Sequence, residues 1–150
     1  MTLPETTTND LTLSITREIQ VAASLEATFA ALLEELGPHN TGAEGRPMPM
    51  KIEAGPGGRW FRDLGDDNGH LWGHVQAIKR PTLLEISGPL FMSYAAVNNL
   101  QYRLTPANGG TQINFKHTAF GLIPEEVRTG VETGWNDIHN RVRKNAESRR

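Results

Sequence analysis

The chain has 150 residues, 37% of them hydrophobic and 21% charged, with a formal net charge of −2. These values are typical of one globular domain with a sizeable core, and they disfavour a nucleic-acid surface, which needs a basic stripe. Cysteine is absent, which excludes disulfides, a thiolate zinc site and a cysteine nucleophile and fits a reducing compartment.

The N-terminal residues show no targeting signal. Residues 1–10 are polar and acidic and lack the basic and apolar regions of a signal peptide, so we expect a disordered tail. No apolar run approaches the ~20 residues that a bilayer crossing requires. We therefore expect a cytoplasmic protein without membrane contact, with a single domain over residues 11–147.

The first predicted elements are a strand and a helix. Apolar and polar residues alternate over residues 11–21, which predicts a strand. Ser24 is placed to cap a helix that ends at Gly37-Pro38. Residues 38–49 are rich in glycine and proline and predict a loop. The helix presents apolar residues at helical spacing, namely Leu25, Phe29, Leu32, Leu33 and Leu36.

Strand and turn signals alternate from residue 51 to residue 120. Asn68-Gly69 predicts a hairpin turn, because both residues accept positive φ. The short links between strands predict antiparallel neighbours. The predicted strands are Lys51–Ala54, Arg59–Leu64, His70–Lys79, Thr82–Ser87, Ala95–Leu104 and Thr111–Phe120.

The last predicted element is a helix from Pro124 to about Ala146. Gly130 and Gly134 interrupt it, and each costs roughly 1 kcal/mol relative to alanine. Two reasons for these glycines remain open, the close approach of another backbone or space for a ligand. A long helix that follows an antiparallel sheet predicts a two-layer α+β domain. The apolar face of the helix consists of Val127, Val131, Trp135, Ile138 and Val142.

Several short motifs occur in an order that is typical of one superfamily. They are Gly57-Gly58-Arg59-Trp60, Gly73-His74-Val75 with Ile78, Pro81 and Leu83-Leu84, Gly109-Gly110-Thr111, and Gly134-Trp135. From about Leu11 to Val142 the chain resembles the START-like (SRPBCC) superfamily, and within it the branch named for the activator of Hsp90 ATPase homologue 1. The resemblance implies the helix-grip fold, β-α-β6-α, in which a curved antiparallel sheet wraps around the long C-terminal helix.

The resemblance also implies an apolar cavity between sheet and helix that binds a small hydrophobic molecule. Loops 38–49 and 88–94 would form its entrance, with Met48, Met50 and Leu90 to Met92 as apolar portal side chains. Similar proteins often have a short helix and a tryptophan where this chain has Gly42–Pro49, so we expect a differently built entrance. The expected ligand-binding residues are Trp60, Trp72, His74, Phe91, Tyr102, Phe115, His117, Trp135 and His139.

Two other functions stay open. A cyclase- or hydrolase-type enzyme would act on a hydrophobic substrate in the same cavity, with His74 and His117 as candidate acid–base groups. A protein-interaction module, similar to a chaperone co-activator, would need a broad apolar patch on the outer face of the sheet. The sequence favours binding over catalysis.

We expect no cofactor and no metal. His70 and His74 lie ~13 Å apart along a strand, too far to share one ion, and the chain has no HExxH motif. The expected partner is a small hydrophobic molecule, and neither nucleic acid nor membrane is expected. The sequence leaves open whether the chain forms a homodimer.

Overall fold

The computed structural model describes residues 11–91 and 94–149. The predicted tail, residues 1–10, and the portal residue Met92 lie outside the described residues. The elements are β1 (Thr12–Val21), α1 (Leu25–Leu36), the 3₁₀ turn η2 (Ala43–Gly45), β2 (Lys51–Ile52), β3 (Arg59–Gly65), β4 (Asn68–Lys79), β5 (Leu83–Gly88), β6 (Ala96–Ala107), β7 (Gly110–Gly121) and α2 (Glu125–Glu147).

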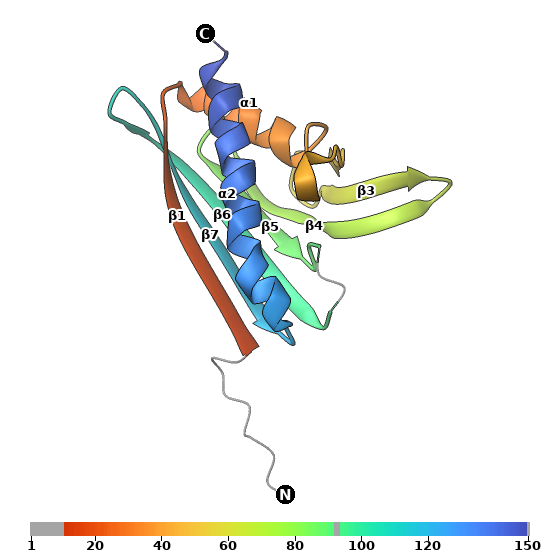
Figure 1. Ribbon diagram of the computed structural model, residues 1–150. Coiled ribbons are helices and arrows are strands. Elements are labelled where there is room, and N and C mark those ends of the chain that lie inside the picture. The colour runs from red at the N-terminus through yellow and green to blue at the C-terminus, as the bar shows by residue number, and fades with distance from the viewer. Residues whose placement is uncertain (1–10, 92–93, 150) are drawn as a thin grey trace, which may run out of the picture.

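The strands form one curved sheet under the long helix. Its seven strands pair antiparallel in the order β1-β7-β6-β5-β4-β3-β2. Helix α2 runs across the face of β1, β7 and β6, and the β3–β4 hairpin extends beyond it (Figure 1). Helix α1 packs beside α2. The predicted α+β helix-grip architecture is confirmed.

The core follows the alternation that the sequence predicted for the two central strands. Every second side chain of β6 and β7 is buried against the helices, because successive side chains of a strand point to opposite faces. Ser24 caps α1 as predicted, since its Oγ accepts a hydrogen bond from the backbone N–H of Ala27 at 3.1 Å. The buried residues of β6 and β7 are Asn98, Leu100, Tyr102, Leu104, Thr111, Ile113, Phe115, His117 and Ala119.

Strand β4 departs from simple alternation, and its irregularities decide which of its side chains are buried. The pairs of β4 with β3 leave Trp72 unpaired, and the pairs with β5 leave Gln76 unpaired. Each irregularity reverses the parity of the residues that follow it. Trp72 and Val75 are therefore both buried, whereas His74 is exposed on the outer side. The sequence left open which face of strand 70–79 points inward, and this bulged geometry leaves His74, one of the predicted ligand-binding residues, exposed.

The β3–β4 turn also lies two residues before the predicted position. Asp66 and Asp67 have φ values of 53° and 59°, and Asn68-Gly69 already belongs to β4. Aspartate tolerates this left-handed conformation when the two-residue turn must match the twist of the strands. Strand β6 extends to Ala107 and includes Pro106. Proline is tolerated there because β5 does not pair with β6 beyond Arg103, so this part of β6 lies at an edge of the sheet.

Candidate functional site

Aromatic side chains form a continuous row on the concave face of the sheet. The ring centroids of Trp60 and Trp72 are 5.1 Å apart, those of Trp72 and Phe91 5.8 Å, and those of Phe91 and Trp135 6.4 Å. Trp135 also contacts Phe115 at 5.0 Å. These separations are in the range of favourable aromatic pairs. The row joins the β3–β4 hairpin to α2 through the loop after β5.

A chain of hydrogen bonds fixes the position of Trp135. Its Nε1–H donates to Nδ1 of His117 at 3.0 Å, and His117 Nε2 lies 2.7 Å from Oδ1 of Asn98. Asn98 in turn donates through Nδ2 to the carbonyl oxygens of Gly88 and Pro89. Because Nδ1 accepts, the proton of the neutral imidazole resides on Nε2 and is donated to Asn98. This network connects β5, β6, β7 and α2.

A second buried pair lies deeper under α2. The hydroxyl of Tyr102 is 3.0 Å from Nε2 of His139, while Nδ1 of His139 has no hydrogen-bond partner. Burial raises the pKa of the Tyr102 hydroxyl. Burial lowers the pKa of His117 to about 4, and burial together with the positive charge of Arg17 lowers the pKa of His139 to about 4. Both imidazoles are therefore neutral at physiological pH.

A pocket opens beside this core, between α2, from Val127 to Arg141, and the loop after α1. Its volume is about 440 Å³, within the usual range for small-molecule sites. Its polar lining residues are Asn40, Thr41, Glu44, Asp137 and Arg141, and the rest of the lining is apolar or glycine. The residues that line the pocket are Asn40, Thr41, Gly42, Glu44, Gly45, Met48, Trp72, Phe91, Val127, Gly130, Val131, Gly134, Trp135, Asp137, Ile138 and Arg141.

The two glycines of α2 form part of the pocket wall. A Cβ atom built on Gly130 or Gly134 would meet no atom within 4 Å. Close approach of another backbone is therefore the wrong explanation for these glycines. The helix has open space where two side chains would otherwise project into the pocket.

Alanine at either glycine is expected to stabilise the protein. Gly130→Ala and Gly134→Ala should each raise the unfolding free energy by up to about 1 kcal/mol, because alanine loses less backbone entropy in a helix and the added methyl group has room. Urea denaturation of the two single variants would measure this. A loss of stability in either variant would contradict the open geometry. Gly37→Ala serves as the opposite control, since its Cβ would lie 2.8 Å from the carbonyl oxygen of Leu33.

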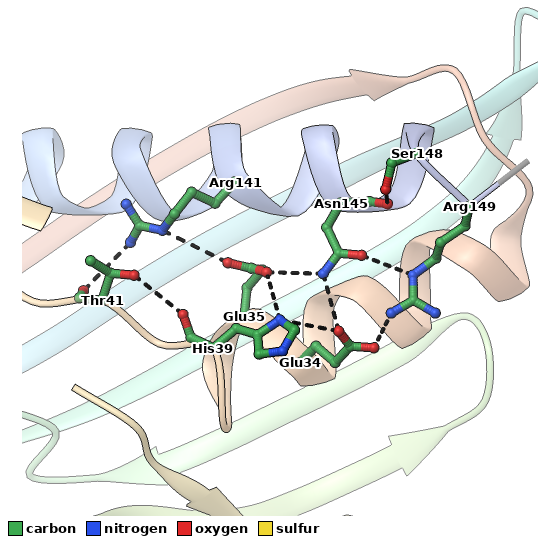
Figure 2. Close-up of polar contacts among 8 residues, drawn as sticks. All are labelled: Glu34, Glu35, His39, Thr41, Arg141, Asn145, Ser148 and Arg149. Atoms are coloured by element: carbon green, nitrogen blue, oxygen red, sulfur yellow. Dashed lines mark hydrogen bonds and ion pairs between the residues drawn. The ribbon is translucent and has the colours of Figure 1, made fainter. Parts of the chain in front are cut away.

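Polar contacts join the two helices behind the pocket (Figure 2). The carboxylate of Glu35 is buried, with 8% of its side chain exposed, and accepts a hydrogen bond from Asn145 at 2.9 Å. Arg141 approaches the same carboxylate, with Nε 3.8 Å from Oε1 of Glu35. Nearer the C-terminus of α2, Arg149 pairs with Glu34. These contacts fix α2 against α1 and hold the Arg141 side chain at the pocket.

The structure divides the predicted ligand-binding residues into three groups. Trp72, Phe91 and Trp135 line the pocket, and so does the portal residue Met48. His74 is exposed on the outer side of β4. The others lie buried in the core and do not line the pocket, namely Trp60, Tyr102, Phe115, His117 and His139. Their predicted contact with a ligand gains no support from the pocket.

Sequence reasoning missed three polar residues that matter here. Asn98 has the same strand parity as Leu100 and Tyr102, so alternation could have placed it inside. Glu35 interrupts the apolar face of α1, and Asn40 lies in an irregular loop, so no periodicity indicates that either is buried.

Two loops contribute to the pocket entrance as expected, but only in part. Residues from the predicted loop 38–49 form one side, and Phe91 from the loop after β5 forms another. Met50 and Leu90 are instead buried in the core, with 3% and 0% of their surfaces exposed. The loop includes the 3₁₀ turn η2 (Ala43–Gly45).

The family described as Activator of Hsp90 ATPase homolog 1-like protein matches residues 22–147 of the chain. The chain belongs to this family. The match covers α1 to α2, and therefore every pocket-lining residue. Among curated proteins, none matches the chain at a significant level.

Solved structures show the same fold at low sequence identity. An uncharacterized protein from Rhizobium leguminosarum superposes with a TM-score of 0.69 at 14% identity, covering 91% of this chain and 95% of that one. Ara h 8.0201 gives 0.67 at 17% identity, covering 91% and 99%. The di-domain ARO/CYC StfQ from the steffimycin biosynthetic pathway gives 0.67 at 13% identity, covering 95% of this chain and 53% of that one.

Two negative observations apply to the part of the chain that the structure describes. Neither helix has the length and apolar character needed to cross a bilayer. Within the same residues, no three His, Asp or Glu side chains gather into a group that could hold a metal ion.

Proposed function

We propose that the protein binds a small hydrophobic molecule in the pocket between α2 and the loop after α1. The observation that best supports this function is a largely apolar pocket of about 440 Å³. The helical wall of this pocket has no side chains at Gly130 and Gly134. An interior helix position is costly for glycine, so two of them on one pocket wall are consistent with selection for space. The predicted site therefore shifts from the centre of the sheet to the pocket beside it.

The proposed ligand would lie against aromatic and branched aliphatic side chains. Trp72, Phe91 and Trp135 provide large flat surfaces, and Val131 and Ile138 extend the apolar wall along α2. The hydrogen bond from Trp135 to His117 keeps its ring in place before a ligand arrives. A preorganised apolar wall favours binding because little side-chain entropy is lost on association.

The two histidines that were candidate acid–base groups, His74 and His117, lie on opposite faces of the sheet. His117 is fully buried beneath Trp135, whereas His74 is exposed on the opposite face of the sheet. General acid–base catalysis requires its groups within hydrogen-bond reach of one substrate. This pair cannot act together, and ligand binding is the function that the pocket supports best.

An interaction surface has narrower support. Val97 and Phe120 are cross-strand partners on β6 and β7, with 67% and 53% of their surfaces exposed, and Leu122 follows with 65%. These side chains lie at one end of the sheet and do not form the broad patch that this alternative requires. We therefore rank it second to ligand binding.

Filling the pocket should weaken binding without unfolding the protein. We expect wild type to bind the neutral fluorescent probe N-phenyl-1-naphthylamine, and Gly134→Leu to weaken binding at least about tenfold, because the new side chain would occupy the pocket. Fluorescence titration would measure this, with circular dichroism to establish that the variant is folded.

The matched control is Thr133→Leu, which places the same side chain one residue earlier on α2, at an exposed position that does not line the pocket. It should leave probe binding unchanged. Equal affinity of Gly134→Leu and wild type, or no binding by wild type, would refute the proposed site. In a separate experiment, native mass spectrometry of freshly purified protein would detect any hydrophobic molecule that co-purifies.

A further inference from the structure

We propose that His70 is a positioning residue for the Trp72 wall of the pocket, and that protonation of His70 weakens ligand binding. The inference rests on the proposed function, because Trp72 lines the same pocket. It adds a means of regulation, since the affinity for the ligand would follow the pH. A single hydrogen bond between His70 and Trp72 carries the argument.

The two tryptophans that line the pocket are held in the same way. Trp135 donates its Nε1–H to Nδ1 of His117 at 3.0 Å. Trp72 donates its own Nε1–H to Nδ1 of His70 at 3.1 Å, and the two rings meet edge to face with their centroids 6.3 Å apart. Because Nδ1 accepts in both pairs, the proton of each neutral imidazole resides on Nε2. Each of these tryptophans therefore depends on an unprotonated histidine nitrogen.

The two histidines differ in their access to protons. His117 is fully buried, and burial lowers its pKa to about 4. His70 is exposed near the start of β4, and the β3–β4 hairpin extends beyond α2 (Figure 1). Histidine is the side chain whose charge changes between about pH 5 and 8 when solvent reaches it. The Trp72 wall is therefore the one whose hydrogen-bond partner a proton can reach.

The charged groups around His70 come from β2, β3 and the β3–β4 turn. Arg62 is the cross-strand partner of His70, and its Nη1 donates to the carbonyl oxygen of Pro49 at 2.6 Å. Among the residues that the structure describes, Trp72 is the only hydrogen-bond partner of the His70 side chain. The link between these two side chains is therefore direct. The charged residues that line the same shallow hollow as His70 are Lys51, Arg59, Arg62, Asp63, Asp66 and Asp67.

Protonation removes this link. A protonated imidazole carries N–H donors on both nitrogens and has no acceptor. Nδ1–H of His70 would then face Nε1–H of Trp72, so the hydrogen bond is lost and the two rings must separate. Trp72 borders the pocket with only 8% of its surface exposed. Once its partner is lost, the ligand must order the Trp72 side chain on binding, and this cost lowers the affinity.

Fluorescence titration with N-phenyl-1-naphthylamine at about pH 8 and about pH 5.5 would test the inference, with circular dichroism to establish that the protein is folded at both. We expect the affinity of wild type to fall about fivefold at the lower pH, a factor that corresponds to one hydrogen bond. His70→Asn should bind equally well at both, because its Oδ1 replaces Nδ1 as the acceptor and does not titrate. His70→Leu has no acceptor and should bind weakly at both.

The matched control is His39→Asn, the same substitution at an exposed histidine in the loop that borders the pocket. His39 pairs with Glu34 and is not in contact with Trp72 through any hydrogen bond of the described residues. This variant should therefore keep the pH dependence of wild type. The buried His117 and His139 are present in every variant, so their contribution cancels in the comparison.

The outcomes separate this inference from the proposed function. An affinity of wild type that does not change with pH, or a loss that persists in His70→Asn, would overturn the inference and leave the proposed function intact. No binding by wild type at either pH would overturn both.

The indole N–H resonance of Trp72, assigned with the Trp72→Phe variant, gives a readout without any ligand. In nuclear magnetic resonance spectra it should shift between the two pH values in wild type and stay constant in His70→Asn, because only wild type loses the acceptor. A resonance that stays constant in wild type would overturn the role of His70 as well.

Discussion

Acidification from about pH 7.5 to about 4 is expected to lower the unfolding free energy by about 6 kcal/mol, through two histidines. Burial lowers the pKa of both His117 and His139 to about 4 from 6.5. In this interval the unfolded chain binds a proton at each residue and the folded chain does not. Stability is therefore full above the unfolded pKa and falls as the pH decreases, by about 3 kcal/mol for each histidine.

The hydrogen bonds explain why a proton is excluded from His117. Its Nδ1 accepts from Trp135, so a proton there would place two N–H donors against each other. A loss of about 6 kcal/mol is comparable to the whole stability of a typical domain, so we expect unfolding near the acidic end of the interval. Urea denaturation across the interval, followed by tryptophan fluorescence, would measure the change.

Substitution of one histidine should remove about half of this pH dependence. His139→Gln keeps a hydrogen-bonding group opposite Tyr102 but cannot titrate. The control is His74→Gln, which makes the same substitution at an exposed position outside the buried core. If His139→Gln retained the full pH dependence of the wild type, the assignment to the buried pair would be wrong.

Loss of the imidazole of His117 is the second large effect that we expect. His117→Leu should lower the unfolding free energy by about 3 kcal/mol at neutral pH, because it leaves the buried Nε1–H of Trp135 without its acceptor and removes the hydrogen bond between His117 and Asn98. The apolar replacement has comparable bulk, so lost hydrogen bonding dominates over cavity formation. Urea denaturation of the variant and the wild type would measure the difference.

A double-mutant cycle would show that the contact itself is responsible. Trp135→Phe removes the same hydrogen bond from the other side and leaves Nδ1 of His117 without a donor. The double variant should be less destabilised than the sum of the single variants by about 1 kcal/mol or more, since the orphaned partners disappear together. Strict additivity would contradict a coupled pair.

The buried network also links stability to the pocket. Trp135 forms part of the pocket wall, and His117 and Asn98 connect it to the carbonyl oxygens that precede Phe91. Two of the three aromatic walls are therefore positioned through one chain of hydrogen bonds. This rigidity allows the pocket to remain open without collapse of its aromatic residues.

The sequence by itself determined the architecture. Alternation in residues 96–107 and 110–121, the Ser24 cap and the apolar stripe of the last helix all reflect contacts between near neighbours, which follow the periods of strands and helices. The same patterns placed Tyr102, Phe115 and Trp135 inside the protein. The glycines of the last helix indicated either a close backbone approach or space for a ligand, and the sequence did not choose between them.

Only the tertiary structure decided which inward residues line a pocket. Phe115, His117 and Trp135 are all buried, yet Trp135 alone among these also borders the open space. The bulges that turn His74 outward depend on pairing with β3 and β5, and the exposure of Gly130 and Gly134 to the pocket depends on how the loop after α1 is placed. Such features result from packing between distant segments, which no local periodicity records.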